Sequence, residues 1–202
     1  MTGSDLPNRI GPMESIRAFI AIDLSEEARA VLANAGETLA RRVPSGVVKW
    51  VSPQKMHLTL RFLGDTPLEK LDELFAALDR TVSAHPPFSL HLDELGCFPN
   101  RRRPRVVWVG VQGDTAQAEA LRDDIEEMAA AMGWEPEQRP FRPHLTLGRV
   151  KEKGAALDLP WGQGVAPAKI AVDAVHLFES QLRPSGAVYT VRHTSHLQGA
   201  AG

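Results

Sequence analysis

The tetrapeptide His-Leu-Thr-Leu occurs twice in this chain, at 57–60 and again 87 residues later at 144–147. Each copy favours extended backbone, and each follows a stretch with the pattern of a strand, a helix and a strand. A single copy is typical of an ordinary half-buried strand with an exposed histidine. Two identical copies in matching contexts instead predict two similar lobes that each present the same strand to a shared site.

Alternation along a strand determines where the two copies point. Residues two apart lie on the same face, so His57 and Thr59 share one face of the first copy while the leucines face a core. The second copy repeats this arrangement with His144 and Thr146. If the lobes face each other, two imidazoles and two hydroxyls converge on one central cleft.

The other predicted elements lack the strict alternation of a doubly wound α/β fold. Expected strands cover 16–24, 47–51, 57–63, 88–95, 105–111, 144–150, 169–178 and 187–193, with a loop at 151–164. Expected helices cover 25–42, a segment that begins near Pro67, and 114–132; Ser25 is a suitable N-cap for the first. The strand at 16–24 is apolar throughout and is expected to be buried on both faces. We therefore expect an α+β fold of two pseudo-symmetric lobes, each a mainly antiparallel sheet with flanking helices.

Length and composition limit the class of protein. The 202 residues suffice for one bilobal domain, expected at 14–196, between a tail at 1–13 and a flexible C-terminal segment at 197–202. No apolar run approaches the roughly 20 residues that span a bilayer. The single cysteine, Cys97, excludes an internal disulfide and indicates a reducing compartment. We expect a cytoplasmic monomer with no membrane attachment. The formal net charge of −2 gives no bulk attraction to nucleic acid, so binding it needs a local positive potential.

Two histidines in one cleft are suited to in-line displacement at phosphorus. A neutral imidazole takes a proton from water while an imidazolium protonates the leaving oxygen, and histidine titrates near pH ~6.5. Threonine hydroxyls and an arginine can bind the phosphate oxygens. Arg61 lies four residues past His57 and Arg149 five past His144, so their alternation differs. Arg149 has the odd offset and needs a bulge or a strand end to reach the cleft.

At these residues the sequence resembles the bacterial and archaeal RNA 2',3'-cyclic phosphodiesterases, also called 2'-5' RNA ligases, of the 2H phosphoesterase superfamily. The similarity runs from Arg17 to Tyr189. It rests on RAFIAIDL, KWVSPQKMHLTLRFLGD, PFSLHLDELGCFP, RPRVVWVGV, RPFRPHLTLGR and HLFESQLRPSGAVYTV. The resemblance implies two pseudo-symmetric lobes around a central cleft, with no cofactor and no required metal.

The resemblance also implies residue roles. His57 would donate a proton to the leaving 3' oxygen, and His144 would accept one from water. Thr59 and Thr146 would hold phosphate oxygens, and Arg149 corresponds to a phosphate-contacting arginine found in some members. The implied enzyme hydrolyses terminal 2',3'-cyclic phosphates on RNA to 2'-phosphomonoesters, and its reverse reaction would form 2'-5' linkages. Two alternatives stay open: a phosphodiesterase for small cyclic nucleotides, ADP-ribose cyclic phosphate or 2'-5' oligoadenylates, and a non-catalytic RNA-end binder.

Other residues have both functional and ordinary interpretations. A basic run in a proline-rich loop is equally consistent with an RNA contact and with a solvated connection; it comprises Arg101, Arg102, Arg103 and Arg105. Phe141, Trp50 and Phe62 could stack on a terminal base, with Phe141 the best candidate, although core packing is the commoner fate of such aromatics. The remaining histidines show no zinc-motif spacing, and we expect no metal site among them; they are His85, His91, His176, His193 and His196.

Overall fold

The computed structural model describes residues 14–151, 157–184 and 186–199. The tail predicted at 1–13 lies outside the described residues, as do part of the loop expected at 151–164 and the last three residues of the predicted C-terminal segment. Within the described parts, no helix is long and apolar enough to cross a membrane.

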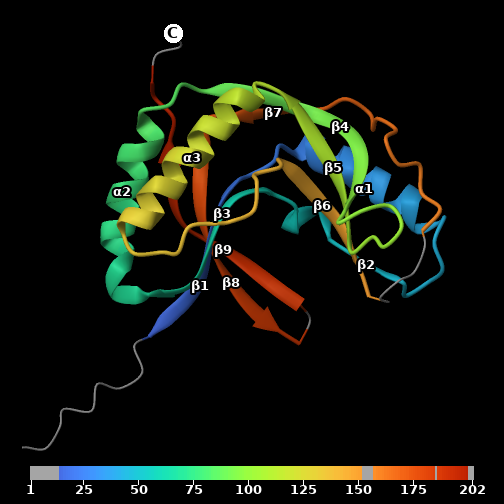
Figure 1. Ribbon diagram of the computed structural model, residues 1–202, viewed down its shortest axis with the longest axis horizontal. Coiled ribbons are helices and arrows are strands. Elements are labelled where there is room, and N and C mark those ends of the chain that lie inside the picture. The colour runs from blue at the N-terminus through green and yellow to red at the C-terminus, as the bar shows by residue number, and fades with distance from the viewer. Residues whose placement is uncertain (1–13, 152–156, 185, 200–202) are drawn as a thin grey trace, which may run out of the picture.

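The described residues form three α-helices, two short 3-10 helices and nine strands (Figure 1). The helices are α1 (Glu26–Ala40), α2 (Leu71–Ser83) and α3 (Thr115–Ala131), with η1 at Pro53–Lys55 and η2 at Leu68–Lys70. The strands are β1 (Ser15–Ile22), β2 (Val48–Trp50), β3 (Leu58–Pro67), β4 (Phe88–Phe98), β5 (Val106–Gly113), β6 (His144–Val150), β7 (Lys169–Val172), β8 (Ala174–Arg183) and β9 (Gly186–His196).

Local sequence explains where these elements begin. Ser25 caps α1, since its hydroxyl accepts a hydrogen bond from the Ala28 backbone N–H at 3.2 Å. Glu26 and Glu27 in the first turn complement the helix dipole. Strand β1 is buried on both faces, as expected: Ile20 lies in the main core, while Phe19 belongs to a second, smaller apolar cluster.

All nine strands belong to one antiparallel sheet, which confirms the predicted α+β class. The order is β7-β4-β5-β6-β3-β1-β8-β9, and β2 pairs with β6 beside this path. The two copies of the tetrapeptide meet in the middle, where β3 and β6 are joined by the single pair Leu58 and Leu145. Both leucines are fully buried. The two lobes are thus halves of one sheet, joined at this pair.

The prediction of a single strand at 169–178 is wrong, because the structure has two strands there. β7 pairs with β4 at one edge of the sheet, whereas β8 pairs with β1 and β9 at the other. Only Asp173 separates them, so the sheet must curl until its two ends approach each other. Burial changes phase at this point, since Ile170 and Val172 are buried before Asp173 and Val175 and Leu177 after it. The sequence pattern did not reveal the break, because apolar residues occupy both alternating sets of positions here.

Each lobe takes strands from both halves of the chain, a topology that the sequential repeat did not predict. β2, β4, β5, β6 and β7 form one lobe, and β1, β3, β8 and β9 form the other. Helix α1 follows β1 in sequence but packs on β2, β6 and β7, while α3 follows β5 and packs on β3 and α2 (Figure 1). The crossed helices tie the two lobes together.

Because the leucine pair is the only ladder contact between β3 and β6, we expect Leu58→Ala to destabilise the whole sheet. Truncating a fully buried leucine should lower the free energy of unfolding by about 2–5 kcal/mol. Leu182→Ala is the matched control, since Leu182 on β8 is 72% exposed. Urea unfolding of both variants provides the measurement; similar losses in the two would contradict the role given to this pair.

Candidate active site

The pair Leu58 and Leu145 fixes the geometry of four polar side chains. Antiparallel pairing at this point places His57 and Thr146 on one side of the leucines and Thr59 and His144 on the other. The leucines point into the core, so all four polar side chains point to the opposite face, where each is half-buried. The structure therefore brings the two predicted tetrapeptides together about a local two-fold axis.

A β-bulge follows each tetrapeptide at the same position. On β3, Ala21 pairs with Thr59 and Ile20 with Arg61, so Leu60 is the extra residue. On β6, Trp108 pairs with Thr146 and Val107 with Gly148, so the extra residue is Leu147. Each bulge inserts one residue and reverses the alternation that follows it. In each tetrapeptide, the last leucine is therefore the extra residue that forms the bulge.

The bulges determine which of the two arginines reaches the histidine face. Beyond Leu147 the reversed alternation turns Arg149 to the face of His144, across the odd offset seen in the sequence. On β3 the same reversal turns Arg61 away. Arg61 is buried instead, forms an ion pair with Glu126 at 3.0 Å and donates to the backbone carbonyl of Glu135.

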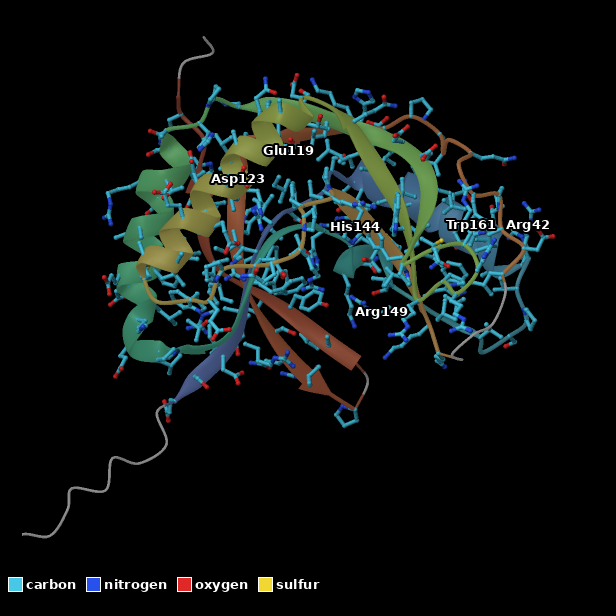
Figure 2. The ribbon with its side chains drawn as sticks, in the orientation of Figure 1. Arg42, Glu119, Asp123, His144, Arg149 and Trp161 are labelled. Atoms are coloured by element: carbon cyan, nitrogen blue, oxygen red, sulfur yellow. The ribbon has the colours of Figure 1, made fainter. Side chains whose placement is uncertain are left out.

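Arg149 acts electrostatically on both imidazoles. Burial is the largest cause that lowers the pKa of His57 and that of His144. The positive charge of Arg149 adds a smaller effect in the same direction. A nearby positive charge disfavours the charged form of an imidazole. Figure 2 shows Arg149 on the same strand as His144, near the end of β6.

His57 lies in an aromatic environment. Its ring centroid is 4.7 Å from that of Phe19, 5.3 Å from Tyr189 and 6.0 Å from Phe178. Burial lowers the pKa of His57 to about 4, and a hydrogen bond to the Lys55 backbone carbonyl opposes this only in part. In the free protein at neutral pH this imidazole is therefore uncharged.

His144 is held by its backbone. Its Nδ1 lies 2.6 Å from the carbonyl oxygen of Arg142, and its ring contacts Phe98 edge-on at 4.9 Å between centroids. A carbonyl can only accept, so Nδ1 carries the proton and the neutral ring leaves the Nε2 lone pair free. Burial is the main cause that lowers the pKa of His144. Each histidine thus binds the carbonyl two residues before it, as the local symmetry requires.

A sequence profile described as the 2'-5' RNA ligase superfamily matches residues 27–184. The chain belongs to this superfamily. It is 34% identical over 191 residues to an RNA 2',3'-cyclic phosphodiesterase of Thermotoga maritima, covering 91% of this chain and 97% of that protein. Its identity to a protein of that name from Thermus thermophilus is 36% over 200 residues, with 93% of each covered.

Solved structures of similar sequence have the same fold. The crystal structure of E. coli LigT complexed with 3'-AMP matches with a TM-score of 0.75 at 30% identity, covering 91% of this chain and 99% of that one. The Thermus thermophilus protein TT0787 gives a TM-score of 0.75 at 34% identity, covering 92% and 100%. The E. coli protein has also been crystallised with phosphate, and that structure matches with a TM-score of 0.70.

The aromatic residues considered as stacking platforms differ in exposure. Trp50 and Phe141 pack against the main core, and Phe141 also lies beneath the Arg122 guanidinium, so the best candidate from the sequence is a packing residue. Phe62 is 55% exposed and lies 6.0 Å from Phe19, because the β3 bulge turns it to the histidine face. Of the three aromatic residues considered from the sequence, Phe62 is the exposed one.

The remaining histidines do not gather around a metal. His85 pairs with Asp124, His193 pairs with Asp79, and His176 bonds to the Thr194 hydroxyl. Across 14–151, 157–184 and 186–199, no three His, Cys, Asp or Glu side chains come close enough to bind one ion. The sequence analysis missed the aromatic residues around His57. Phe19, Phe178 and Tyr189 come together through strand pairing, so they could be recognised as neighbours only once that pairing is known.

The depressed pKa of His57 predicts a pH-dependent stability. Between its ordinary value of 6.5 and about 4, the unfolded chain binds a proton that the folded chain does not, so stability falls as pH falls through this window. His57→Phe keeps an aromatic ring in the cluster and removes the proton. The loss in free energy of unfolding from pH 7.5 to 4.5 should shrink by up to about 3 kcal/mol.

Urea unfolding at the two pH values provides this measurement. Replacing the exposed His91 of β4 by Phe is the control, and it should leave the pH dependence close to that of the unchanged protein. Parallel stability curves for His57→Phe and the unchanged protein would show that His57 is not held neutral by burial.

Proposed function

We propose that the protein hydrolyses terminal 2',3'-cyclic phosphates on RNA to 2'-phosphomonoesters. The observation that carries this proposal is the convergence of two His-x-Thr pairs about one leucine pair, with Arg149 turned to the same face. Relatives named RNA 2',3'-cyclic phosphodiesterase, similar over nearly their whole length, support the same substrate.

In the proposed mechanism, the Nε2 atom of His144 takes a proton from a water molecule. The water oxygen bonds to phosphorus as the bond from phosphorus to the 3' oxygen breaks. The His57 imidazolium gives its proton to that 3' oxygen, so charge and protons balance and the phosphate remains on the 2' oxygen. Thr59 and Thr146 donate to the non-bridging oxygens, and Arg149 stabilises their negative charge.

The acid must be charged before it can donate, yet His57 is neutral in the free protein. A cyclic phosphate carries one negative charge, and an anion beside an imidazole favours the protonated form. Substrate therefore raises the pKa of His57 on binding and offsets the burial that depresses it. Burial lowers the pKa of His57 to about 4, so its protonation needs the substrate. His144 needs no such change, because it accepts a proton in the neutral form that it has in the free protein.

The role of each histidine is tested with two leaving groups. His57→Ala and His144→Ala should each lower kcat by about 10²–10⁴-fold on an oligonucleotide with a 2',3'-cyclic phosphate. A substrate with sulfur in place of the 3' oxygen needs no proton on its leaving group. It should restore most of the rate to His57→Ala and little to His144→Ala; restoration of the opposite variant would exchange the two roles.

His85→Ala is the matched control, since His85 is paired with Asp124 outside the site. The assays contain EDTA, and product is identified as a 2'- or 3'-phosphate by chromatography. Loss of activity in EDTA, or a 3'-phosphate product, would remove the mechanism proposed here.

The pH profile provides an independent test. One base and one acid predict a bell-shaped kcat/KM, and because the pKa values of both histidines are lowered in the free protein, the bell should be displaced to the acid side of pH 6.5. Arg149→Gln removes a cation that lowers both pKa values, so both limbs should move to higher pH while kcat falls. Unmoved limbs would show that Arg149 does not influence the imidazoles, and a flat profile from pH 5 to 9 would contradict paired imidazole catalysis.

Two other functions are separated by simple comparisons. A strong preference for cyclic mononucleotides over oligonucleotides would favour the small-nucleotide activity. Equal losses of affinity and turnover in His57→Ala would favour an RNA-end binder. The exposed Phe62 beside Phe19 favours a substrate that carries a base, since a phenyl face can stack on any nucleobase.

We further propose that the protein acts as a monomer in the cytoplasm. Cys97 has no cysteine partner within the chain, and burial raises the pKa of its thiol, which disfavours reactive disulfide chemistry. Both copies of the tetrapeptide come from one chain, so the site does not require a second subunit. Sedimentation of the purified protein tests the oligomeric state.

A further inference from the structure

A cationic edge lies beside the candidate site; it consists of Lys49, Arg105, Arg149 and Lys151. Lys49 of β2 pairs directly with Arg149 of β6. The backbone continues this adjacency, because the Val150 N–H donates to the Arg105 carbonyl and the Lys151 N–H to the Val47 carbonyl. Lys49, Arg105, Arg149 and Lys151 are all exposed.

Lys49 and Arg149 are like charges on the same face of an antiparallel pair. Residues directly opposite each other have side chains that meet on one face, and like charges there destabilise the sheet. The neighbours of Lys49, Val48 and Trp50, point to the other face, where α1 packs. Within the described part of the chain, no carboxylate lies within salt-bridge distance of Lys49 or Arg149.

Charge is separated across the molecule despite the small net charge. The segments 41–55, 97–113 and 138–151 contain no aspartate or glutamate, and strands from all three meet at this edge. Helix α3 on the other lobe is acidic, and Figure 2 shows its Glu119 and Asp123 on the opposite side of the molecule from Arg42. A polyanion that enters the site is therefore attracted along β2 and repelled from α3.

We propose that Lys49 binds the first internucleotide phosphate of the RNA, the one that joins the terminal nucleotide to the nucleotide before it. This inference rests on the proposed function and deepens it, because it makes Lys49 a residue that selects RNA chains over mononucleotides.

The geometry separates the roles of the two cations. Arg149 lies on the strand that carries His144 and is turned to the same face, which assigns it to the scissile phosphate in the proposed mechanism. The side chain of Lys49 comes from β2, one strand further from β3. A second phosphate on the same strand of RNA would lie against Lys49 and relieve its repulsion from Arg149. The sugar of the terminal nucleotide would then bridge the two cations.

The test compares two substrates that differ by one phosphodiester and one nucleoside. One is a 2',3'-cyclic mononucleotide, and the other is a dinucleotide ending in the same cyclic phosphate. Lys49→Gln should lower kcat/KM for the dinucleotide about tenfold and leave the mononucleotide unchanged. Lys49→Arg should retain most of the dinucleotide activity. The logarithm of kcat/KM for the dinucleotide should also depend less steeply on salt, by about 0.7 in slope.

Lys169→Gln is the matched control, since it removes the same charge from an exposed lysine of β7, an edge strand three strands away from β6. Equal losses on both substrates would overturn the inference, because Lys49 would then act at the scissile phosphate. No loss on either substrate would overturn it as well. If the unchanged protein hydrolyses neither substrate, the proposed function fails; if it hydrolyses both and Lys49→Gln has no effect, only this inference fails.

Discussion

The contact between Leu58 and Leu145 is the constraint on which the rest of the structure depends. One buried pair joins the two halves of a curled sheet, and the strands diverge on either side of it. Because the pair points into the core, the residues before and after each leucine point out together. The site therefore inherits its two-fold arrangement from the core, and the backbone carbonyls of Lys55 and Arg142 orient the two imidazoles.

The local symmetry is broken immediately beyond the bulges. Phe62 and Arg149 occupy equivalent positions after the two tetrapeptides, and each is turned to the histidine face by the extra leucine of its own strand. One side of the site thus presents an exposed phenyl ring and the other a guanidinium. A substrate with a flat base at one end and charged phosphates at the other is asymmetric in the same sense, so it can bind in one orientation only.

The sequence predicted the residues of the site more completely than it predicted the order of the strands. Strand alternation alone grouped His57 with Thr59, and the odd offset of Arg149 indicated that a bulge was needed, which the register of β6 contains. The division at Asp173 could not be predicted, because apolar residues occupy both alternating sets of positions from Ile170 to Phe178. The exchange of strands and helices between lobes also depends on long-range pairing that local patterns do not encode.

Three features of the site cost stability in the free protein. Burial disfavours the charged form of both imidazoles, a lysine stands directly opposite an arginine, and a large aromatic ring is left exposed. Each of these costs is relieved by the same ligand: an anion charges an imidazole, phosphates screen the two cations, and a base covers the phenyl ring. A ligand that removes one of these costs gains the same free energy on binding. The site therefore favours the ligand that supplies all three contacts. A free phosphate ion supplies one of them, a cyclic mononucleotide two, and an RNA end all three.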